Sequence, residues 1–225
     1  MGKIKLICLP YGGGSRTTYD NLINRINKDI ECIPIEYKGH GIRYKEGLYN
    51  SIQEAGEDVF NIIKNDIVNS RYAFYGHCIG GMITYEVYKN IVKSKLNPPE
   101  KIFFGAIGKL NDIELNDDIF ITEFMKENQY FSDKLMYDKI YKFVEPILKK
   151  ELRISAEYYE QLDKVSIDCD VVLINGNEDK FVNVNEAEAF IDTKNNSKKY
   201  LVNGKHMFIN DSYDEVAEII NNELV

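Results

Sequence analysis

Two glycines flanking a cysteine constrain this chain more than any other feature. Residues 76–81, GHCIGG in sequence letters, directly follow the apolar run YAFY at 72–75. Glycines two positions before and after Cys78 predict a nucleophile elbow, a sharp strand-to-helix turn in which a Cβ at either position would collide across the turn. We therefore expect Cys78 to lie at the carboxyl end of a sheet, before a helix whose N-terminus favours the reactive thiolate.

Strand-like and helix-like segments alternate along most of the chain. Strands are predicted at 3–9, 31–35, 72–75, 101–106, 171–175 and 199–202, and helices at 18–28, 51–69, 82–92 and 213–224. Ser51 and Glu54 form a capping box at the start of the second helix. Continuous apolar strands separated by helices predict the α/β class, with a mostly parallel central sheet covered by helices on both faces.

Composition indicates one globular domain over residues 1–225, with 44% hydrophobic and 28% charged residues. A net charge of −8 argues against nucleic acid or an anionic membrane as a partner. The four cysteines contain no Cys-x-x-Cys pair, which argues against a disulfide framework and a metal site. The N-terminus lacks the apolar region of a signal peptide, so we expect a cytoplasmic protein without a membrane span.

One segment interrupts the alternation between two strands. Residues 111–153, called the lid segment below, combine many charges with Phe, Tyr and Met side chains such as Phe120, Phe124, Met125 and Phe143. Two or three amphipathic helices packed on the core are the simpler interpretation. We favour a helical lid over the ligand-binding edge of the sheet, because an insertion at this place in the fold lies beside the site.

A catalytic thiol needs a base and an orienting acid, and the chain has three histidines. His206 follows the last predicted strand, the place of the histidine in the chain order nucleophile, acid, histidine. His77 is expected to point away from the site, and His40 lies in a loop after the second strand. Asp179, three residues after the glycine in NGNEDK at 175–180, is the predicted acid, with Glu178 as the alternative.

The fourth part of the predicted site is an oxyanion hole, formed by the backbone N–H groups of Ile79 and Gly12. Gly12 lies in the glycine loop, residues 10–15 with the sequence PYGGGS. A phosphate-binding loop is the alternative, but no Gly-Lys-Ser/Thr follows and the glycine spacing is not that of a dinucleotide-binding motif. Tyr11, Gly13 and Met207 are predicted to contact the substrate.

These motifs together resemble the type II thioesterases of nonribosomal peptide and polyketide biosynthesis, within the α/β-hydrolase superfamily. The resemblance covers nearly the whole chain. The glycine loop is similar to the family's Pro-Tyr-Ala-Gly-Gly-Ser, and the elbow matches Gly-His-Ser-Met-Gly except at Cys78 and Ile79. Residues 33–43, 152–153 and 204–208 look like the family's Leu-Pro-Gly-Arg-Gly-Glu-Arg, Leu-Arg-Ala-Asp and Gly-Gly-His-Phe-Phe segments.

The resemblance implies hydrolysis of acyl groups on the phosphopantetheine arm of carrier proteins, or of similar acyl thioesters, through an acyl-enzyme intermediate on Cys78. It implies no cofactor and no metal, an acyl or peptidyl carrier protein as the partner, and a monomer. Lys149, Lys150 and Arg153 are candidates for docking the carrier, and a merely solvated charged face explains them equally well.

The chain departs from the family at two positions, with Cys78 in place of serine and Ser155 in place of aspartate. A cysteine exchanges one thioester for another, so its acyl-enzyme stays activated toward amines and thiols. An acyltransferase or amide-forming enzyme is therefore the alternative to a hydrolase. An engineered serine replacement would give the same sequence. A non-catalytic carrier-binding module is disfavoured, because His206 and Asp179 complete the triad.

Overall fold

The computed structural model describes residues 2–109, 124–126, 134–182, 184–193 and 195–225. Within them, one parallel sheet has the strand order β2-β1-β3-β4-β5-β6. The strands are β1 (Ile4–Leu9), β2 (Ile30–Pro34), β3 (Tyr72–His77), β4 (Lys101–Gly105), β5 (Asp170–Gly176) and β6 (Ser197–Val202). The predicted α/β-hydrolase sheet is confirmed.

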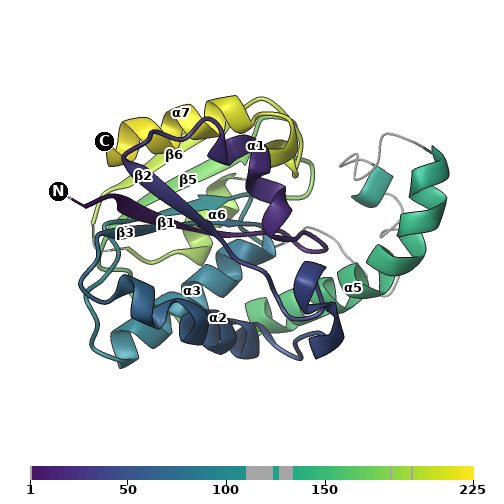
Figure 1. Ribbon diagram of the computed structural model, residues 1–225, viewed down its shortest axis with the longest axis horizontal. Helices are drawn as coiled ribbons and strands as arrows, with labels where there is room; N and C mark the ends of the chain where they lie inside the picture. The colour runs from purple at the N-terminus through teal and green to yellow at the C-terminus, as the bar shows by residue number, and fades with distance from the viewer. Residues whose placement is uncertain (1, 110–123, 127–133, 183, 194) are drawn as a thin grey trace.

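Helices cover both faces of this sheet, with α2 and α3 on one side and α1 and α7 on the other (Figure 1). Alternate residues of each strand serve the two layers: Ile7 and Phe74 pack toward α2 and α3, whereas Leu6 and Tyr75 pack toward α1 and α7. The helical elements are η1 (Arg16–Tyr19), α1 (Asp20–Ile23), η2 (Gly41–Glu46), α2 (Ile52–Ile67), α3 (Ile79–Lys93), α5 (Lys134–Glu160), α6 (Val184–Phe190), η3 (Phe208–Asn210) and α7 (Tyr213–Leu224).

The helix predicted at 18–28 is wrong in its second half, because α1 ends at Ile23. Asn221 of α7 explains the early end. Its side-chain oxygen accepts the N–H of Asn27 at 2.8 Å, and its amide donates to the carbonyl of Arg25 at 3.1 Å. These bonds hold the backbone in turns that a continuing helix would not allow. By contrast, Ser51 caps α2 as predicted, accepting the Glu54 N–H at 3.0 Å.

Two stretches of the lid segment, residues 111–123 with Phe120 and residues 127–133, lie outside the described residues. The described part is Phe124 and Met125, both buried, and the long helix α5, which continues past Arg153 to Glu160. Figure 1 shows α5 curving from the sheet toward one end of the molecule, with Pro146 inside it.

A buried carboxylate attaches α5 to the helix that follows the elbow. Glu86 of α3 is 6% exposed and accepts the Tyr158 hydroxyl of α5 at 2.7 Å. Lys89 completes the cluster by donating to the same carboxylate oxygen at 2.8 Å. Because α3 starts at the predicted nucleophile, this contact fixes the C-terminal half of α5 relative to the site.

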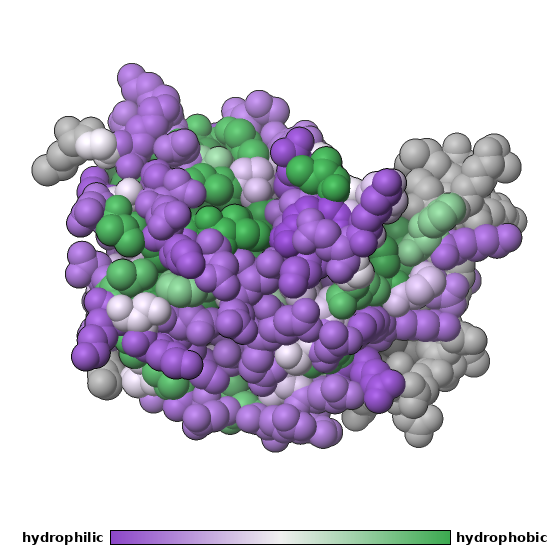
Figure 2. Space-filling model, turned by 60° about the horizontal axis from the view of Figure 1, so that its bottom comes forward, coloured by the Kyte–Doolittle hydropathy of each residue, from purple (hydrophilic) through white to green (hydrophobic). Residues whose placement is uncertain are grey.

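The face formed by α2 and α3 is predominantly hydrophilic, and its hydrophobic side chains occur in small groups separated by charged and polar ones (Figure 2). In the part of the chain that the structure describes, no helix has the length and apolar character needed to cross a membrane.

The elbow glycines generate a stability prediction. A Cβ on Gly76 would lie 2.5 Å from the Gly80 carbonyl oxygen and from the Thr84 hydroxyl, so backbone must move. Gly76→Ala should lower the free energy of unfolding by about 3 kcal/mol in urea titrations. Gly2→Ala is the control, since nothing lies within 4 Å of its Cβ position. Equal unfolding midpoints for the two variants would contradict a tight elbow.

Candidate active site

Cys78 occupies the turn between β3 and α3 with φ 54° and ψ −119°. This left-handed backbone is rare for a residue with a side chain and is a source of local strain. The turn is held by two backbone bonds, from Cys78 N–H to the Gly105 carbonyl at 2.8 Å and from Gly81 N–H to the Cys78 carbonyl at 2.9 Å. The cysteine is thus presented at the carboxyl end of the sheet and at the N-terminus of α3, as the elbow motif predicts.

The structure brings His206 and Asp179 together from the loops after β6 and β5. His206 Nδ1 donates to Asp179 Oδ2 at 2.9 Å, and both side chains are fully buried. The other carboxylate oxygen accepts the N–H groups of Phe181 and Val182 at 2.9 and 3.1 Å. Glu178, the alternative acid, is exposed, and its backbone N–H donates to the Gly204 carbonyl at 2.9 Å. Of the two candidates, Asp179 is therefore the carboxylate that bonds to the imidazole.

The electrostatics of this pair make His206 a stronger base than a free imidazole. Burial opposes the imidazolium, but the Asp179 carboxylate, followed by Cys78, outweighs burial and raises the pKa of His206. Burial also opposes ionisation of Asp179, and His206 together with the two N–H groups lowers the pKa of that carboxyl. The second ring nitrogen, His206 Nε2, is buried without a hydrogen-bond partner among the described residues. An unpaired buried nitrogen next to Cys78 suits a proton acceptor.

His77 supports the histidine loop rather than the reaction. Its Nε2 donates to the carbonyl of His206 at 2.8 Å, and its Nδ1 lies 3.1 Å from the Tyr75 hydroxyl. Burial, with the nearby His206 charge, lowers the pKa of His77 to about 3, so the ring stays neutral. The expectation that His77 is a structural neighbour agrees with this position, although the bond to His206 could not be read from the sequence.

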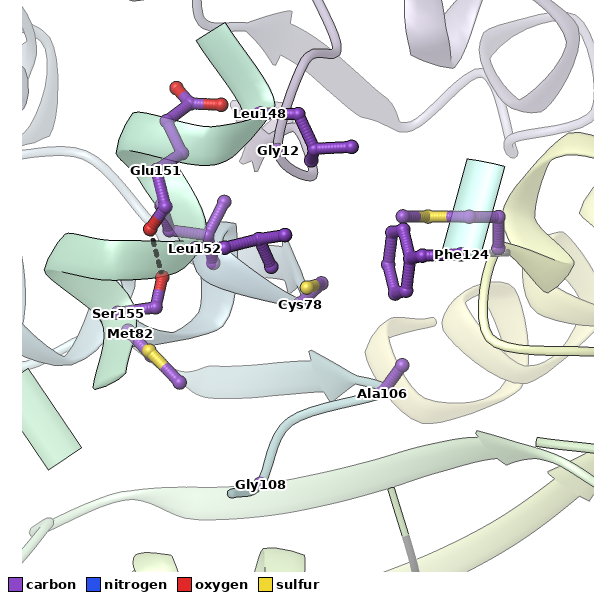
Figure 3. Close-up of a pocket in the computed structure, with 12 residues that line it drawn as sticks. Gly12, Cys78, Met82, Ala106, Gly108, Phe124, Leu148, Glu151, Leu152 and Ser155 are labelled. Carbon is purple, nitrogen blue, oxygen red and sulfur yellow. Dashed lines mark hydrogen bonds between the residues drawn. The ribbon is translucent and has the colours of Figure 1, made fainter. Parts of the chain in front are cut away.

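A pocket opens beside Cys78, lined mainly by apolar side chains of the elbow, of α5 and of the lid segment (Figure 3). Phe124 faces Cys78 across the pocket and packs on the ring of His206, with a centroid distance of 5.5 Å. The lining residues are Gly12, Cys78, Ile79, Met82, Ala106, Gly108, Phe124, Leu148, Glu151, Leu152, Ser155 and Met207.

Several predicted site residues meet at this pocket. Gly12, Ile79 and Met207 line it with Cys78. The other two predicted substrate contacts, Tyr11 and Gly13, are not among the residues that line this pocket. The Tyr11 hydroxyl donates to Asn210 at 3.0 Å, and the Gly13 N–H donates to Glu151 at 2.7 Å. In this arrangement Gly13 supports the glycine loop, and its N–H faces a carboxylate rather than the pocket.

Sequence reasoning missed one functional-site residue, Glu151. This glutamate of α5 lines the pocket and is 4% exposed. Its carboxylate contacts both the glycine loop and His40, which also is buried. The only available signal was a glutamate next to Leu152 and Arg153 in the family-like segment, and nothing in the sequence identifies its partners. No cluster of metal-ligating side chains occurs among the described residues.

Comparison with known families identifies the family to which this chain belongs. Residues 4–224 match the family described as "Thioesterase domain". Because the match spans almost the entire chain, the protein belongs to the thioesterase family. The resemblance inferred from the motifs is thus confirmed at the level of the family and the fold.

Curated relatives extend over nearly the same length. Thioesterase PikA5 of Streptomyces venezuelae is 24% identical over 99% of this chain and 81% of its own length. Gramicidin S biosynthesis protein GrsT of Aneurinibacillus migulanus is 26% identical over 99% of this chain and 89% of its own length.

A solved structure shares the fold. ClbQ from the colibactin NRPS/PKS pathway superposes with a TM-score of 0.87 at 24% identity, covering 98% of this chain and 96% of that one.

The acid assignment generates a kinetic prediction. Asp179→Asn keeps the shape of the side chain but cannot hold the imidazole in the required tautomer and charge, so kcat for a small acyl thioester should fall at least about 100-fold. Glu178→Gln is the matched control on the adjacent exposed side chain and should change kcat by less than about twofold. A larger loss for Glu178→Gln than for Asp179→Asn would transfer the role to Glu178.

Proposed function

We propose that this protein hydrolyses acyl thioesters on the phosphopantetheine arm of carrier proteins, using Cys78 as nucleophile, His206 as base and Asp179 as orienting acid. The observation that carries the proposal is the buried His206–Asp179 pair beside a cysteine held at positive φ at the start of α3. Family membership supports the reaction class, and the relatives named above support the carrier-bound substrate.

The first half of the proposed reaction is acyl transfer to the enzyme. His206 takes the proton of the Cys78 thiol, and the sulfur attacks the thioester carbonyl to form a tetrahedral oxyanion. The N–H groups of Gly12 and Ile79 stabilise that oxyanion. The carbon–sulfur bond to pantetheine then breaks, and the pantetheine thiolate takes the proton from the His206 imidazolium.

The second half is hydrolysis of the acyl-enzyme. His206 removes a proton from water, the water oxygen attacks the Cys78 thioester, and the same two N–H groups stabilise the second oxyanion. Collapse releases the carboxylic acid, and the Cys78 sulfur recovers its proton from His206. Asp179 remains ionised throughout and stabilises each imidazolium.

The pocket supports an acyl substrate. Met82, Leu148 and Leu152 give it an apolar wall opposite Phe124 (Figure 3). Methionine and phenylalanine side chains pack against acyl chains of different shapes. The acyl group would occupy this pocket, with the pantetheine arm entering beside the glycine loop.

The carrier protein is the proposed partner, and the three basic docking candidates receive limited support. Lys149 pairs with Glu145 at 2.8 Å, and Arg153 pairs with Glu157 at 2.9 Å. Lys150 donates to Asn50 at 2.9 Å, which links α5 to the start of α2. Because two of the three charges are paired within α5, their docking role stays a prediction.

Transfer of the acyl group to an amine is the second candidate function. Cys78 favours it, because acylation of cysteine preserves the thioester free energy that an oxyester would lose. The apolar pocket favours it further, since a site that excludes water extends the lifetime of an activated acyl-enzyme.

The nucleophile assignment predicts selective labelling. Burial raises the pKa of the Cys8 thiol and that of Cys169, the latter to about 12, so neither should react at pH 7. Cys32 is partly exposed, and hydrogen bonding with Cys8 lowers its pKa, so the experiment uses a Cys32→Ala background. Iodoacetamide should then modify Cys78, as read by peptide mass spectrometry, and His206→Ala should slow labelling about tenfold. Uniform labelling of the remaining cysteines would reject Cys78.

The choice between hydrolysis and transfer has a separate test. Acyl-pantetheine thioesters, with and without added amine, should give mainly free acid with the wild type and no product with Cys78→Ala. Cys78→Ser should raise the ratio of acid to amide at least about threefold, because an oxyester reacts less readily with amines than a thioester does. Amide as the main wild-type product would favour the transferase, and an unchanged ratio would remove the argument from cysteine.

A further inference from the structure

A second buried histidine–carboxylate pair lies beside the pocket, and the proposed reaction does not use it. His40 Nε2 lies 3.1 Å from Glu151 Oε1, with the two side chains 3% and 5% exposed. His40 comes from the loop between β2 and η2, whereas Glu151 comes from α5. The pair therefore joins the body of the fold to the helix that forms one wall of the pocket.

The geometry around His40 favours its charged form. Its Nδ1 lies 2.9 Å from the Lys38 carbonyl, and its Nε2 lies 3.1 Å from Glu151 Oε1 as an ion-pair contact that lacks hydrogen-bond geometry. Burial opposes this charge, but Glu151, with a smaller contribution from Glu36, raises the pKa of His40. A buried carboxylate opposite a charged imidazole has a fixed position, because separating the two would leave a charge buried alone.

The second oxygen of the same carboxylate contacts the glycine loop. Glu151 Oε2 accepts the Gly13 N–H at 2.7 Å, a short bond to a charged acceptor. The same oxygen lies 3.4 Å from the position that a Cβ on Gly12 would take. Glu151 Oε1 thus contacts His40 and Oε2 bonds to Gly13, which ties the Gly12–Gly13 peptide to α5.

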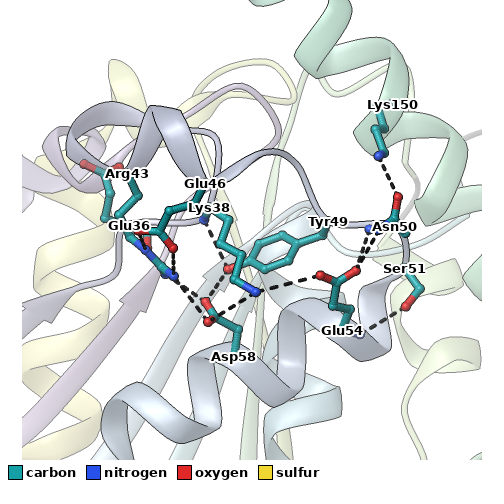
Figure 4. A network of polar contacts seen from close by, with 10 residues as sticks. All are labelled: Glu36, Lys38, Arg43, Glu46, Tyr49, Asn50, Ser51, Glu54, Asp58 and Lys150. Atoms are coloured by element: carbon teal, nitrogen blue, oxygen red, sulfur yellow. Dashed lines mark hydrogen bonds and ion pairs between the residues drawn. The ribbon is translucent and has the colours of Figure 1, made fainter.

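The loop that presents His40 is itself anchored. Arg43 donates to Asp58 of α2 at 2.8 Å and to the Glu36 carbonyl at 3.1 Å, and Tyr49 donates to Asp58 at 2.6 Å (Figure 4). The Glu36 carboxylate accepts the Arg16 and Ile42 N–H groups at 3.2 and 3.3 Å. His40 is therefore a fixed point against which Glu151 is positioned.

We infer that Glu151 is a positioning residue of the oxyanion hole, which holds the Gly12–Gly13 peptides in the orientation that stabilises the tetrahedral oxyanion. The inference rests on the proposed function, because it assigns Gly12 as an oxyanion donor. It also makes the oxyanion hole depend on the position of α5, so the pocket wall and the reactive centre are assembled by one contact.

Three substitutions of Glu151 test separately its hydrogen-bond acceptor for Gly13, its negative charge and its side-chain volume. Glu151→Gln keeps an oxygen at full reach for Gly13, and the buried His40 can lose its proton once the carboxylate charge is gone, so kcat should fall by no more than about threefold. Glu151→Asp keeps the charge but shortens the reach, and Glu151→Leu fills the volume without an acceptor. For both, kcat should fall by about 10- to 100-fold with KM little changed, because the lost interaction forms in the transition state.

The rate of Cys78 alkylation distinguishes a positioning role from a general structural defect. A general defect would change this rate, whereas loss of the oxyanion hole alone would not. Iodoacetamide reacts with a thiolate by displacement at a saturated carbon, so no oxyanion forms and no oxyanion hole is needed. All three variants should therefore label Cys78 at the wild-type rate in the Cys32→Ala background, while acylation by an acyl-pantetheine thioester slows for Asp and Leu. Glu157→Gln, on the exposed side of α5, is the control and should leave both rates unchanged.

The outcomes are distinguishable from failure of the proposed function. If Cys78→Ala retains thioester turnover, the mechanism is wrong irrespective of Glu151. If Cys78 is the nucleophile, then equal kcat losses for Gln and Asp, or parallel losses of alkylation and acylation, would overturn the positioning role. Should Glu151→Leu fail to fold, the comparison of Gln with Asp still decides.

Discussion

The active site depends on the close approach of two backbone segments, the elbow and the end of β1. A Cβ on Gly80 would lie 2.2 Å from the Leu9 carbonyl oxygen and 2.6 Å from that of Pro10. Only glycine allows this contact, which places the N-terminus of α3 directly against the start of the glycine loop. Cys78 and Gly12 come from distant parts of the sequence, and this contact makes them neighbours.

Two buried imidazole–carboxylate pairs lie beside Cys78 and have different chemical tasks. In the His206–Asp179 pair, one imidazole nitrogen has no partner among the described residues, so the ring can exchange a proton with Cys78, the proposed nucleophile. In the His40–Glu151 pair, Nδ1 lies 2.9 Å from the Lys38 carbonyl and Nε2 lies 3.1 Å from a carboxylate oxygen as an ion-pair contact, so this imidazole can hold the carboxylate in place. The same residue types can therefore serve as the proposed base in one pair and as an anchor in the other.

The sequence predicted those parts of the site that local backbone geometry demands. Gly76 and Gly80 mark the elbow because a side chain at either position is sterically impossible, and Asp179 and His206 follow their strands in a fixed order. Glu151 could not be found this way, since it meets Gly13 across 138 residues and only the packing of α5 sets which helix face points inward. The early end of α1 has a similar origin, because Asn221 of α7 determines it.

One stripe of α5 supplies a wall of the pocket beside Cys78. Leu148, Glu151, Leu152 and Ser155 recur at the spacing of a single helix face, and all four line the pocket. None of them belongs to the elbow or to the loops after β5 and β6. Substitution of the apolar members would therefore change the shape of the pocket and, in the proposed function, the acyl groups that fit, while the turn that carries Cys78 stays unchanged. Glu151 limits that freedom, because its carboxylate also bonds to the glycine loop, where we infer that it positions the oxyanion hole.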